Sequence, residues 1–247
     1  EVPLGYERSN ALRNVRIYFS RLDRRNNYRT YKQEFVENAN FQSCGEIEST
    51  RRFEVYGGIK MLTHVGTNTI ETERLILRRF EYTDDDAMLK YWVADEKIQS
   101  LYSEPVYSTK DEVKGLLDKY IGSYEKNDYY RWAVVEKTTG ECIGQIAYFL
   151  VDSKNHFAEI EYCIGSDFQC KGFATEATKA VIAYGFDRMN LHKVQICTKT
   201  INEPSKRVIE KCGFVYEGTL RDYFYMNGEY VGRLYFSILR NEFETME

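Results

Sequence analysis

The segment that decides the fold is DFQCKGFATEATKAVIAYGF, residues 167–186, in which a glycine-bearing turn passes directly into an apolar, alanine-rich helix. The first backbone N–H groups of a helix have no partner inside the helix and lie at the positive end of its dipole. Gly172 and Ala174 keep side-chain bulk away from these groups, while Lys171 and Thr175 can add a positive charge and a hydroxyl. The segment is therefore suited to hold an anion such as a pyrophosphate.

Other interpretations of this segment stay open at the level of the motif. Short Gly-x-Ala turns also begin helices for purely structural reasons, with no ligand. A dinucleotide-binding site would need G-x-G-x-x-G and an acidic residue at the end of the following strand, and the sequence has neither feature here. The segment indicates an anion site only together with its surroundings.

From residue 72 onward, strand-like and helix-like segments follow one another. Strands are expected in ERLILRRF (73–80), YRWAVVEK (130–137), CIGQIAYFLV (142–151), FAEIEYCIG (157–165) and HKVQICTK (192–199). Helices are expected in TDDDAMLKYW, with Thr83 and the aspartates at its start, in STKDEVKGLLDKYIGSYEK, with Ser108 or Thr109 as N-cap, and in EPSKRVIEKC, which Gly213 ends. The last segment, YFYMNGEYVGRLYFSIL, is expected to be a hairpin that turns at Asn227 and Gly228. This order predicts an α/β fold with a central mixed sheet and helices on both faces.

The composition is that of a soluble globular protein, with 43% hydrophobic and 29% charged residues among 247. No apolar run approaches the roughly 20 residues of a membrane helix, and the first residues, EVPLGYERSNALRN, lack the apolar segment of a secretory signal. The six cysteines form no C-x-x-C pair and are interpreted as reduced structural thiols of a cytoplasmic protein. His64, His156 and His192 have no close partner at metal-ligand spacing, so no metal site is expected.

The N-terminal part of the chain is basic, whereas the remainder is acidic. Within residues 8–32, eight basic residues stand against one acid. Because Met61 resembles the start of a domain, we expect a basic N-terminal extension over 1–60 and the main domain over 61–247. The extension is expected to dock on an anionic partner such as the ribosome, without membrane contact, or else to pack as a helix against the main domain.

The motifs of the main domain resemble those of the GNAT superfamily of acetyl-CoA-dependent N-acetyltransferases. The shared features are the spacing Q-x-x-G-x-A after AEIEYCI, followed by Asn202 and VIEKCGF. The RimJ/RimL-like branch, the ribosomal-protein N-terminal acetyltransferases and their relatives, is the most similar in TERLILRRF, FATEATKAVIAYGFDRMNLHKV and NEPSKRVIEKCGFVYEGTLRDYFYMNGEY. The resemblance covers roughly residues 70–240 in collinear order and does not cover 1–60. It implies the GNAT fold, a twisted and mostly antiparallel mixed sheet, with acetyl-CoA as co-substrate.

The resemblance also implies where acetyl-CoA binds. The strand at 157–165 would separate from its neighbour, so that its backbone could pair with the amides of the pantetheine arm. Backbone amides of the following turn would hold the pyrophosphate, and the Asn202 side chain would bond to the pantetheine arm. The implied acetyl-CoA contacts are Cys163, Ile164, Gln169, Lys171, Gly172, Phe173, Ala174, Thr175, Asn202 and Ser205.

Two candidate catalytic residues follow from the same resemblance. Glu159 matches the family's acid in AEI and is expected to be the base, while Glu161 shares its face of the strand because the two are two residues apart. Many members carry a tyrosine as acid seven residues after the asparagine, but that position is Ile209 here. Ser205, three residues after Asn202, is therefore the expected acid near the sulfur. The alternatives are a rim carboxylate paired with a basic residue for Glu159, and a helix-face hydroxyl for Ser205.

The energetics of the transfer favour an α-amine as the acceptor. Neutralising an α-amino group of pKa about 7.7–8 at pH 7 costs about 1.4 kcal/mol, whereas a lysine-like amine near pKa 10.4 costs about 4.6 kcal/mol. We therefore expect an N-acetyltransferase, monomeric or homodimeric, that acts on a peptide or protein N-terminus. The alternatives are acetylation of a small amine, such as a polyamine or an antibiotic, and a GNAT-fold module that binds acyl-CoA without turnover.

Overall fold

The computed structural model describes residues 55–56 and 59–245. The predicted basic extension, 1–60, lies outside these residues except for a short antiparallel hairpin just before Met61. The expected contact of 8–32 with an anionic partner therefore lies outside the described residues. That contact and the domain boundary stay predictions.

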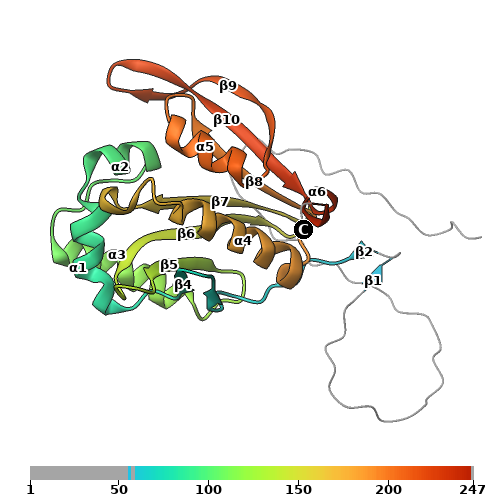
Figure 1. Cartoon of the computed structure of the whole chain (residues 1–247), viewed down its shortest axis with the longest axis horizontal. Coiled ribbons are helices and arrows are strands. Elements are labelled where there is room, and N and C mark those ends of the chain that lie inside the picture. The colour runs from blue at the N-terminus through green and yellow to red at the C-terminus, as the bar shows by residue number, and fades with distance from the viewer. Residues whose placement is uncertain (1–54, 57–58, 246–247) are drawn as a thin grey trace, which may run out of the picture. The chain divides into compact units, whose positions relative to one another are not determined.

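The described part of the main domain is built on an eight-stranded sheet in the order β3-β4-β5-β6-β7-β8-β10-β9 (Figure 1). Every neighbouring pair is antiparallel except β7 and β8, which run parallel. The predicted mixed, mostly antiparallel sheet is confirmed. The strands, with the separate hairpin first, are β1 (Val55–Tyr56), β2 (Ile59–Lys60), β3 (Ile70–Glu71), β4 (Leu75–Arg78), β5 (Tyr130–Glu136), β6 (Cys142–Asp152), β7 (Phe157–Ile164), β8 (Lys193–Lys199), β9 (Val215–Met226) and β10 (Glu229–Leu239).

Helices pack on both faces of the sheet, as predicted (Figure 1). None of the described helices is both long enough and apolar enough to cross a bilayer. One face carries the 3-10 turn η1 (Tyr82–Asp84), α1 (Asp85–Met88), the π-helical turn η2 (Leu89–Val93), α2 (Glu96–Tyr102) and α3 (Lys110–Ser123). The other face carries α4 (Phe173–Met189), which follows the 3-10 turn η3 (Ser166–Phe168), and α5 (Glu203–Lys211), with α6 (Arg240–Glu244) after β10.

The alternation of side chains along the strands separates two hydrophobic cores. On β5, Trp132 belongs to the core under α4, whereas its neighbour Ala133 belongs to the core under α1 and α3. On β7, Ile160 lies in the first core and Cys163 in the second. Even-numbered residues of β7 therefore face α4 and α5, and odd-numbered residues face α1–α3.

Side-chain caps fix two helices on the α1–α3 face. Thr109 is the N-cap of α3, as predicted, and its hydroxyl accepts the amide of Glu112 at 3.3 Å. Helix α2 was not predicted from the sequence, although Asp95 caps it by accepting the amide of Ile98 at 3.1 Å. Ser103 ends α2 in a left-handed conformation with φ of 68°. Asp95 followed by Glu96 was the sequence signal that could have predicted the start of α2.

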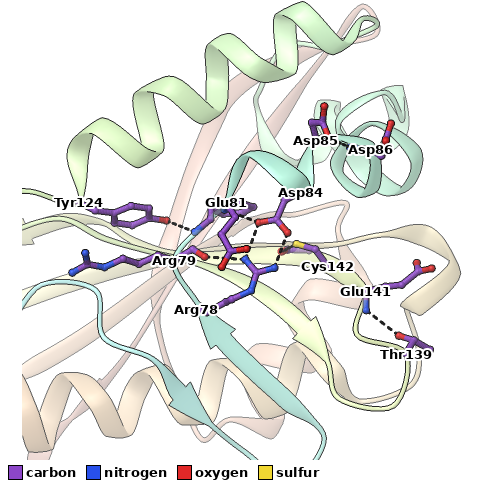
Figure 2. Close-up of polar contacts among 12 residues, drawn as sticks. Arg78, Arg79, Glu81, Asp84, Asp85, Asp86, Tyr124, Thr139, Glu141 and Cys142 are labelled. Carbon is purple, nitrogen blue, oxygen red and sulfur yellow. Dashed lines mark hydrogen bonds and ion pairs between the residues drawn. The ribbon is translucent and has the colours of Figure 1, made fainter.

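The first helical segment begins differently from the sequence prediction. Thr83 is not a cap, because the segment already starts at Tyr82. Asp84 instead forms a bidentate ion pair with Arg78 of β4 at 2.7 and 2.8 Å, and accepts the amide of Glu81 at 2.8 Å (Figure 2). The junction between β4 and the helix is therefore held by a buried carboxylate rather than by a threonine cap.

The polar segment that precedes β4 is anchored to the domain. The amide of Thr63 donates to the carbonyl of Met189 at 2.8 Å, next to the end of α4. The Trp132 indole donates to the carbonyl of Asn68 at 2.7 Å. A segment that reads as loose from its composition is thus held by long-range hydrogen bonds.

Candidate active site

Strands β7 and β8 diverge halfway along their length. Parallel pairs run only from Phe157, opposite Lys193, to Ile160, opposite Ile196, and within the described residues the rest of β7 has no partner on that side. A cavity of about 760 Å³ opens at this divergence. It is lined by α2 on one side of the sheet and by α5 and the start of α4 on the other. The predicted divergence is confirmed, and it joins both faces of the sheet through one cavity.

The turn between η3 and α4 presents unpaired backbone amides to this cavity. Gly172 is the N-cap of α4 with φ of 86°, in the left-handed region that favours glycine. A Cβ atom there would lie 3.2 Å from the guanidinium of Arg74. Among the described groups, none accepts a hydrogen bond from the amides of residues 170–175. These donors lie at the positive end of the helix and can bind phosphate oxygens.

Arg74, just before β4, braces this turn. Its guanidinium donates to Glu176 at 2.7 Å and to the carbonyl of Lys171 at 2.9 Å, and lies 4.7 Å from the centre of the Phe173 ring. Burial alone would raise the pKa of Glu176, but hydrogen bonds from Thr72 and Arg74 hold it below its usual value. The negative charge in the first turn of α4 is thus balanced locally. Sequence reasoning missed this brace, for which the arginine of TERL and the acid of TEA were the only signals.

The other predicted contacts of this turn are arranged around it. The side-chain amide of Gln169 donates to the carbonyl of Ile164 at 2.9 Å and holds the turn against the end of β7. Lys171 is not part of the cavity lining; its ammonium lies over the aromatic ring of η3. Arg207 and Lys211 of α5 line the cavity and add positive charge that sequence reasoning missed. The predicted residues that line the cavity are Cys163, Ile164, Gln169, Gly172, Phe173, Ala174, Thr175, Asn202 and Ser205.

Asn202 and Ser205 lie together at the start of α5. Asn202 is the N-cap, and its carbonyl oxygen accepts the amide of Ser205 at 3.2 Å. Its NH₂ group has no partner among the described residues and can still donate. The Tyr162 hydroxyl, from β7, donates to Ser205 Oγ at 3.1 Å. Burial raises the pKa of Tyr162 above its usual value, so this phenol stays protonated and the Ser205 O–H remains free to donate. Sequence reasoning missed Tyr162.

Glu159 lies behind the cavity wall. Its carboxylate pairs with Arg233 of β10 at 2.8 Å, accepts the side-chain amide of Gln195 at 2.8 Å, and is only 5% exposed. Arg233 lines the cavity, so Glu159 contacts the cavity through this arginine. Its role as the base stays a prediction. Ile209, at the position of the family's tyrosine, is fully buried in the core and supplies no acid.

Glu161, on the same face of β7, does line the cavity. Arg131 of β5 donates to it at 2.5 Å. Tyr102, at the end of α2, also lines the cavity, and its buried hydroxyl has no partner in the described part of the chain. The α2 side of the cavity thus combines a carboxylate with a buried hydroxyl that has no hydrogen-bond partner among the described residues.

Lys199 fixes this side of the cavity. From the end of β8, its ammonium donates to the carbonyls of Ser100 and Leu101 at 2.9 and 2.8 Å and to the Ser103 hydroxyl at 2.6 Å. Burial lowers the pKa of Lys199. Three hydrogen bonds to the last turn of α2 tie that helix to the sheet, which sequence reasoning also missed.

Comparison with known proteins places this site in a family. A profile described as an acetyltransferase (GNAT) domain matches residues 74–215. The uncharacterized N-acetyltransferase p20 of Bacillus licheniformis is 30% identical over 175 residues, which is 71% of this chain and 98% of p20. The spermidine N-acetyltransferase of Vibrio cholerae, solved with CoA and spermine, has a TM-score of 0.62 and 28% identity over 70% of this chain and 99% of that chain. The ribosomal-protein-S5-alanine acetyltransferase of Vibrio fischeri shares the fold, with a TM-score of 0.62 and 24% identity over 71% of this chain and 98% of that one. The chain therefore belongs to the GNAT family and is an N-acetyltransferase that uses acetyl-CoA.

Proposed function

We propose that the acceptor is the α-amine of a peptide or protein N-terminus. The observation that carries this proposal is that both carboxylates on the α1–α3 face of β7 are held by arginines, Glu159 by Arg233 and Glu161 by Arg131. A carboxylate that is paired with an arginine offers little net negative charge to hold a cationic amine. Such a site suits an amine that can enter without its positive charge, and an α-amine of pKa about 7.7–8 loses its proton far more readily than a lysine-like amine.

Acetyl-CoA is expected to enter from the α4–α5 face. The unpaired amides around Gly172 would bind its pyrophosphate, with Arg207 and Lys211 adding positive charge. The NH₂ group of Asn202 would donate to the pantetheine arm, whose amides would pair with the free edge of β7 at Ile164. The thioester would then lie between the diverging strands, where an acceptor can reach it from the α2 side.

The transfer is expected to be direct. Cys163 and Cys197 line the cavity, but burial raises the pKa of each thiol to about 12, so both stay protonated near neutral pH and are poor nucleophiles. The neutral amine attacks the thioester carbon, a C–N bond forms, and the C–S bond breaks. The amine loses one proton and the departing thiolate gains one, and the Ser205 O–H is the expected donor to the sulfur.

A small cationic amine is the second candidate acceptor. Glu104 lines the α2 side of the cavity, is exposed, and has no ion-pair partner among the described residues. A free carboxylate at this place could hold a second positive charge, as a polyamine has. A cytoplasmic location and a monomeric or homodimeric state complete the proposal and stay predictions.

The acceptor is tested by CoA release with a panel of amines at several pH values. The panel contains a peptide with a free α-amine and no lysine, its N-acetylated copy with one lysine, spermidine and an aminoglycoside. At pH 7 we expect the highest kcat/KM for the free α-amine, with the advantage over the lysine peptide shrinking as pH rises toward 10. A higher kcat/KM for spermidine or the aminoglycoside at pH 7 would contradict the α-amine proposal and identify a small amine as the acceptor.

The proposed base is tested by Glu159→Gln. If Glu159 removes the proton, kcat should fall by about a hundredfold or more, with little change in acetyl-CoA affinity. The control is Asp84→Asn, which takes a carboxylate from the partly buried Arg78 outside the cavity and should lower the melting temperature alone. Wild-type kcat in Glu159→Gln, together with a lower melting temperature, would leave Glu159 only as the partner of Arg233.

A further inference from the structure

The α2 side of the cavity carries a polar cluster that is not among the expected acetyl-CoA contacts. It consists of Glu161 on β7, Arg131 on β5 and Tyr102 at the end of α2. Glu161 and Tyr102 line the cavity. Arg131 is 12% exposed and is held between β6 and α3 by the contacts described next.

Arg131 holds one oxygen of Glu161 and leaves the other free. Its Nη2 donates to Oε1 of Glu161 at 2.5 Å, and its Nη1 donates to Gln145 at 2.8 Å. The guanidinium also lies 4.5 Å from the centre of the Tyr120 ring. These contacts fix the orientation of the carboxylate. Oε2 of Glu161 accepts no hydrogen bond from a described residue, and 23% of the side chain is exposed.

The Tyr102 hydroxyl is the second half of the site. It is buried without a partner in the described part of the chain. Leaving a buried hydroxyl unpaired costs about 1–3 kcal/mol, so its place at a cavity wall indicates a ligand that completes it. Burial raises the pKa of Tyr102 well above its usual value, with Arg131 opposing the shift, so the hydroxyl keeps its proton near neutral pH.

We propose that Glu161 and Tyr102 bind the acceptor, with an N–H of its amine donating to Oε2 of Glu161 and the Tyr102 hydroxyl donating to the carbonyl of its first residue. This assignment deepens the proposed function and rests on it. The substrate class is a primary amine that carries a carbonyl oxygen on the adjacent carbon, which an N-terminal residue has and a polyamine lacks. The amine nitrogen gains positive charge as it attacks, so the Glu161 contact strengthens toward the transition state.

The inference is tested with Glu161→Gln and Tyr102→Phe, measured on two acceptors. One is a short peptide with a free α-amine, and the other is an alkylamine of similar size without a carbonyl. On the peptide, we expect kcat/KM to fall roughly ten- to a hundredfold in Glu161→Gln and roughly fivefold in Tyr102→Phe. On the alkylamine, Glu161→Gln should remain impaired, whereas Tyr102→Phe should match the wild type. The Kd for acetyl-CoA should be unchanged in both.

Controls separate binding from folding. Tyr102→Phe removes a buried hydroxyl that has no hydrogen-bond partner among the described residues, so the melting temperature should equal or exceed that of the wild type. Asp84→Asn breaks a comparable arginine pair outside the cavity and should leave the acceptor KM unchanged. Wild-type kinetics in both cavity variants on the peptide, or a weaker acetyl-CoA Kd in either, would overturn the inference alone. A third outcome is that the wild type acetylates only amines without a carbonyl and that Glu161→Gln lowers kcat/KM for these amines. In that case the α-amine proposal and the Tyr102 contact are wrong, and the Glu161 contact stands. No turnover with any amine would overturn both the inference and the proposed function.

Discussion

Gly172→Glu is expected to abolish acetyl-CoA binding. The new carboxylate would project from the N-cap of α4 into the row of unpaired amides around residues 170–175, where the pyrophosphate is expected. Two unit charges 4 Å apart repel each other by about 4 kcal/mol at an effective dielectric constant of 20, which corresponds to roughly a thousandfold in Kd. Calorimetric titration with CoA measures this loss directly.

A matched control for this variant exists in the hairpin between β9 and β10. Gly228 has φ of 85°, nearly the same as the 86° of Gly172, and an added Cβ would meet no atom within 4 Å. Gly228→Glu therefore introduces the same backbone strain and the same charge away from the cavity, and CoA should bind to it as to the wild type. A folded Gly172→Glu variant that binds CoA within about threefold of the Gly228→Glu variant would show that the turn is not the pyrophosphate site.

Ser205→Ala is expected to lower kcat by roughly a hundredfold, at the lower end of the contribution of a general acid. Because the proposed role of the hydroxyl is to protonate the departing sulfur, the loss should fall on kcat while the Kd for acetyl-CoA stays near the wild-type value. The amide of Ser205, which caps α5 through Asn202, is retained in the variant. Single-turnover release of CoA, measured with saturating acceptor, reports the chemical step.

The contact between Tyr162 and Ser205 gives this experiment an internal check. Ser205→Ala also leaves the Tyr162 hydroxyl without its acceptor, which costs about 1–3 kcal/mol of stability by itself. Adding Tyr162→Phe removes that orphan group, and Ser205→Thr restores the hydroxyl. We expect Ser205→Thr to recover much of the rate and the double variant to recover none. Recovery in the double variant would return Ser205 to a helix-face hydroxyl.

Features set by short-range geometry could be predicted from the sequence. The turn at Gly172, the N-cap at Thr109 and the hairpin turn at Asn227 and Gly228 each depend on a few adjacent residues and lie where they were predicted. The divergence of β7 followed from the family resemblance rather than from its residues. Thr83 failed as a cap because the helical segment already begins at Tyr82, where Asp84 pairs with Arg78 and accepts the amide of Glu81.

Contacts between residues far apart in the sequence could not be predicted. Glu159 and Arg233 are separated by 74 positions, and nothing in AEIEYCI distinguishes a paired carboxylate from a free one. The same applies to Arg131 with Glu161, 30 positions apart, and to Lys199 with the end of α2. These pairings depend on which strands become neighbours in the sheet. As a result, the sequence does not show that Glu161 lines the cavity whereas Glu159 does not.

The divergence of β7 and β8 couples ligand binding to the folding equilibrium. From Glu161 to Ile164, one edge of a central strand has no neighbouring strand among the described residues, so its backbone groups depend on water or a ligand for hydrogen bonds. A pantetheine arm bound in that gap, as proposed, would act as a short additional strand. Ligand at 100 times its Kd stabilises the native state by about 2.7 kcal/mol. Bound acetyl-CoA is therefore expected to stabilise the enzyme against unfolding. When acetyl-CoA and CoA are scarce, we expect this end of β7 to exchange its amide hydrogens sooner than the rest of the central sheet.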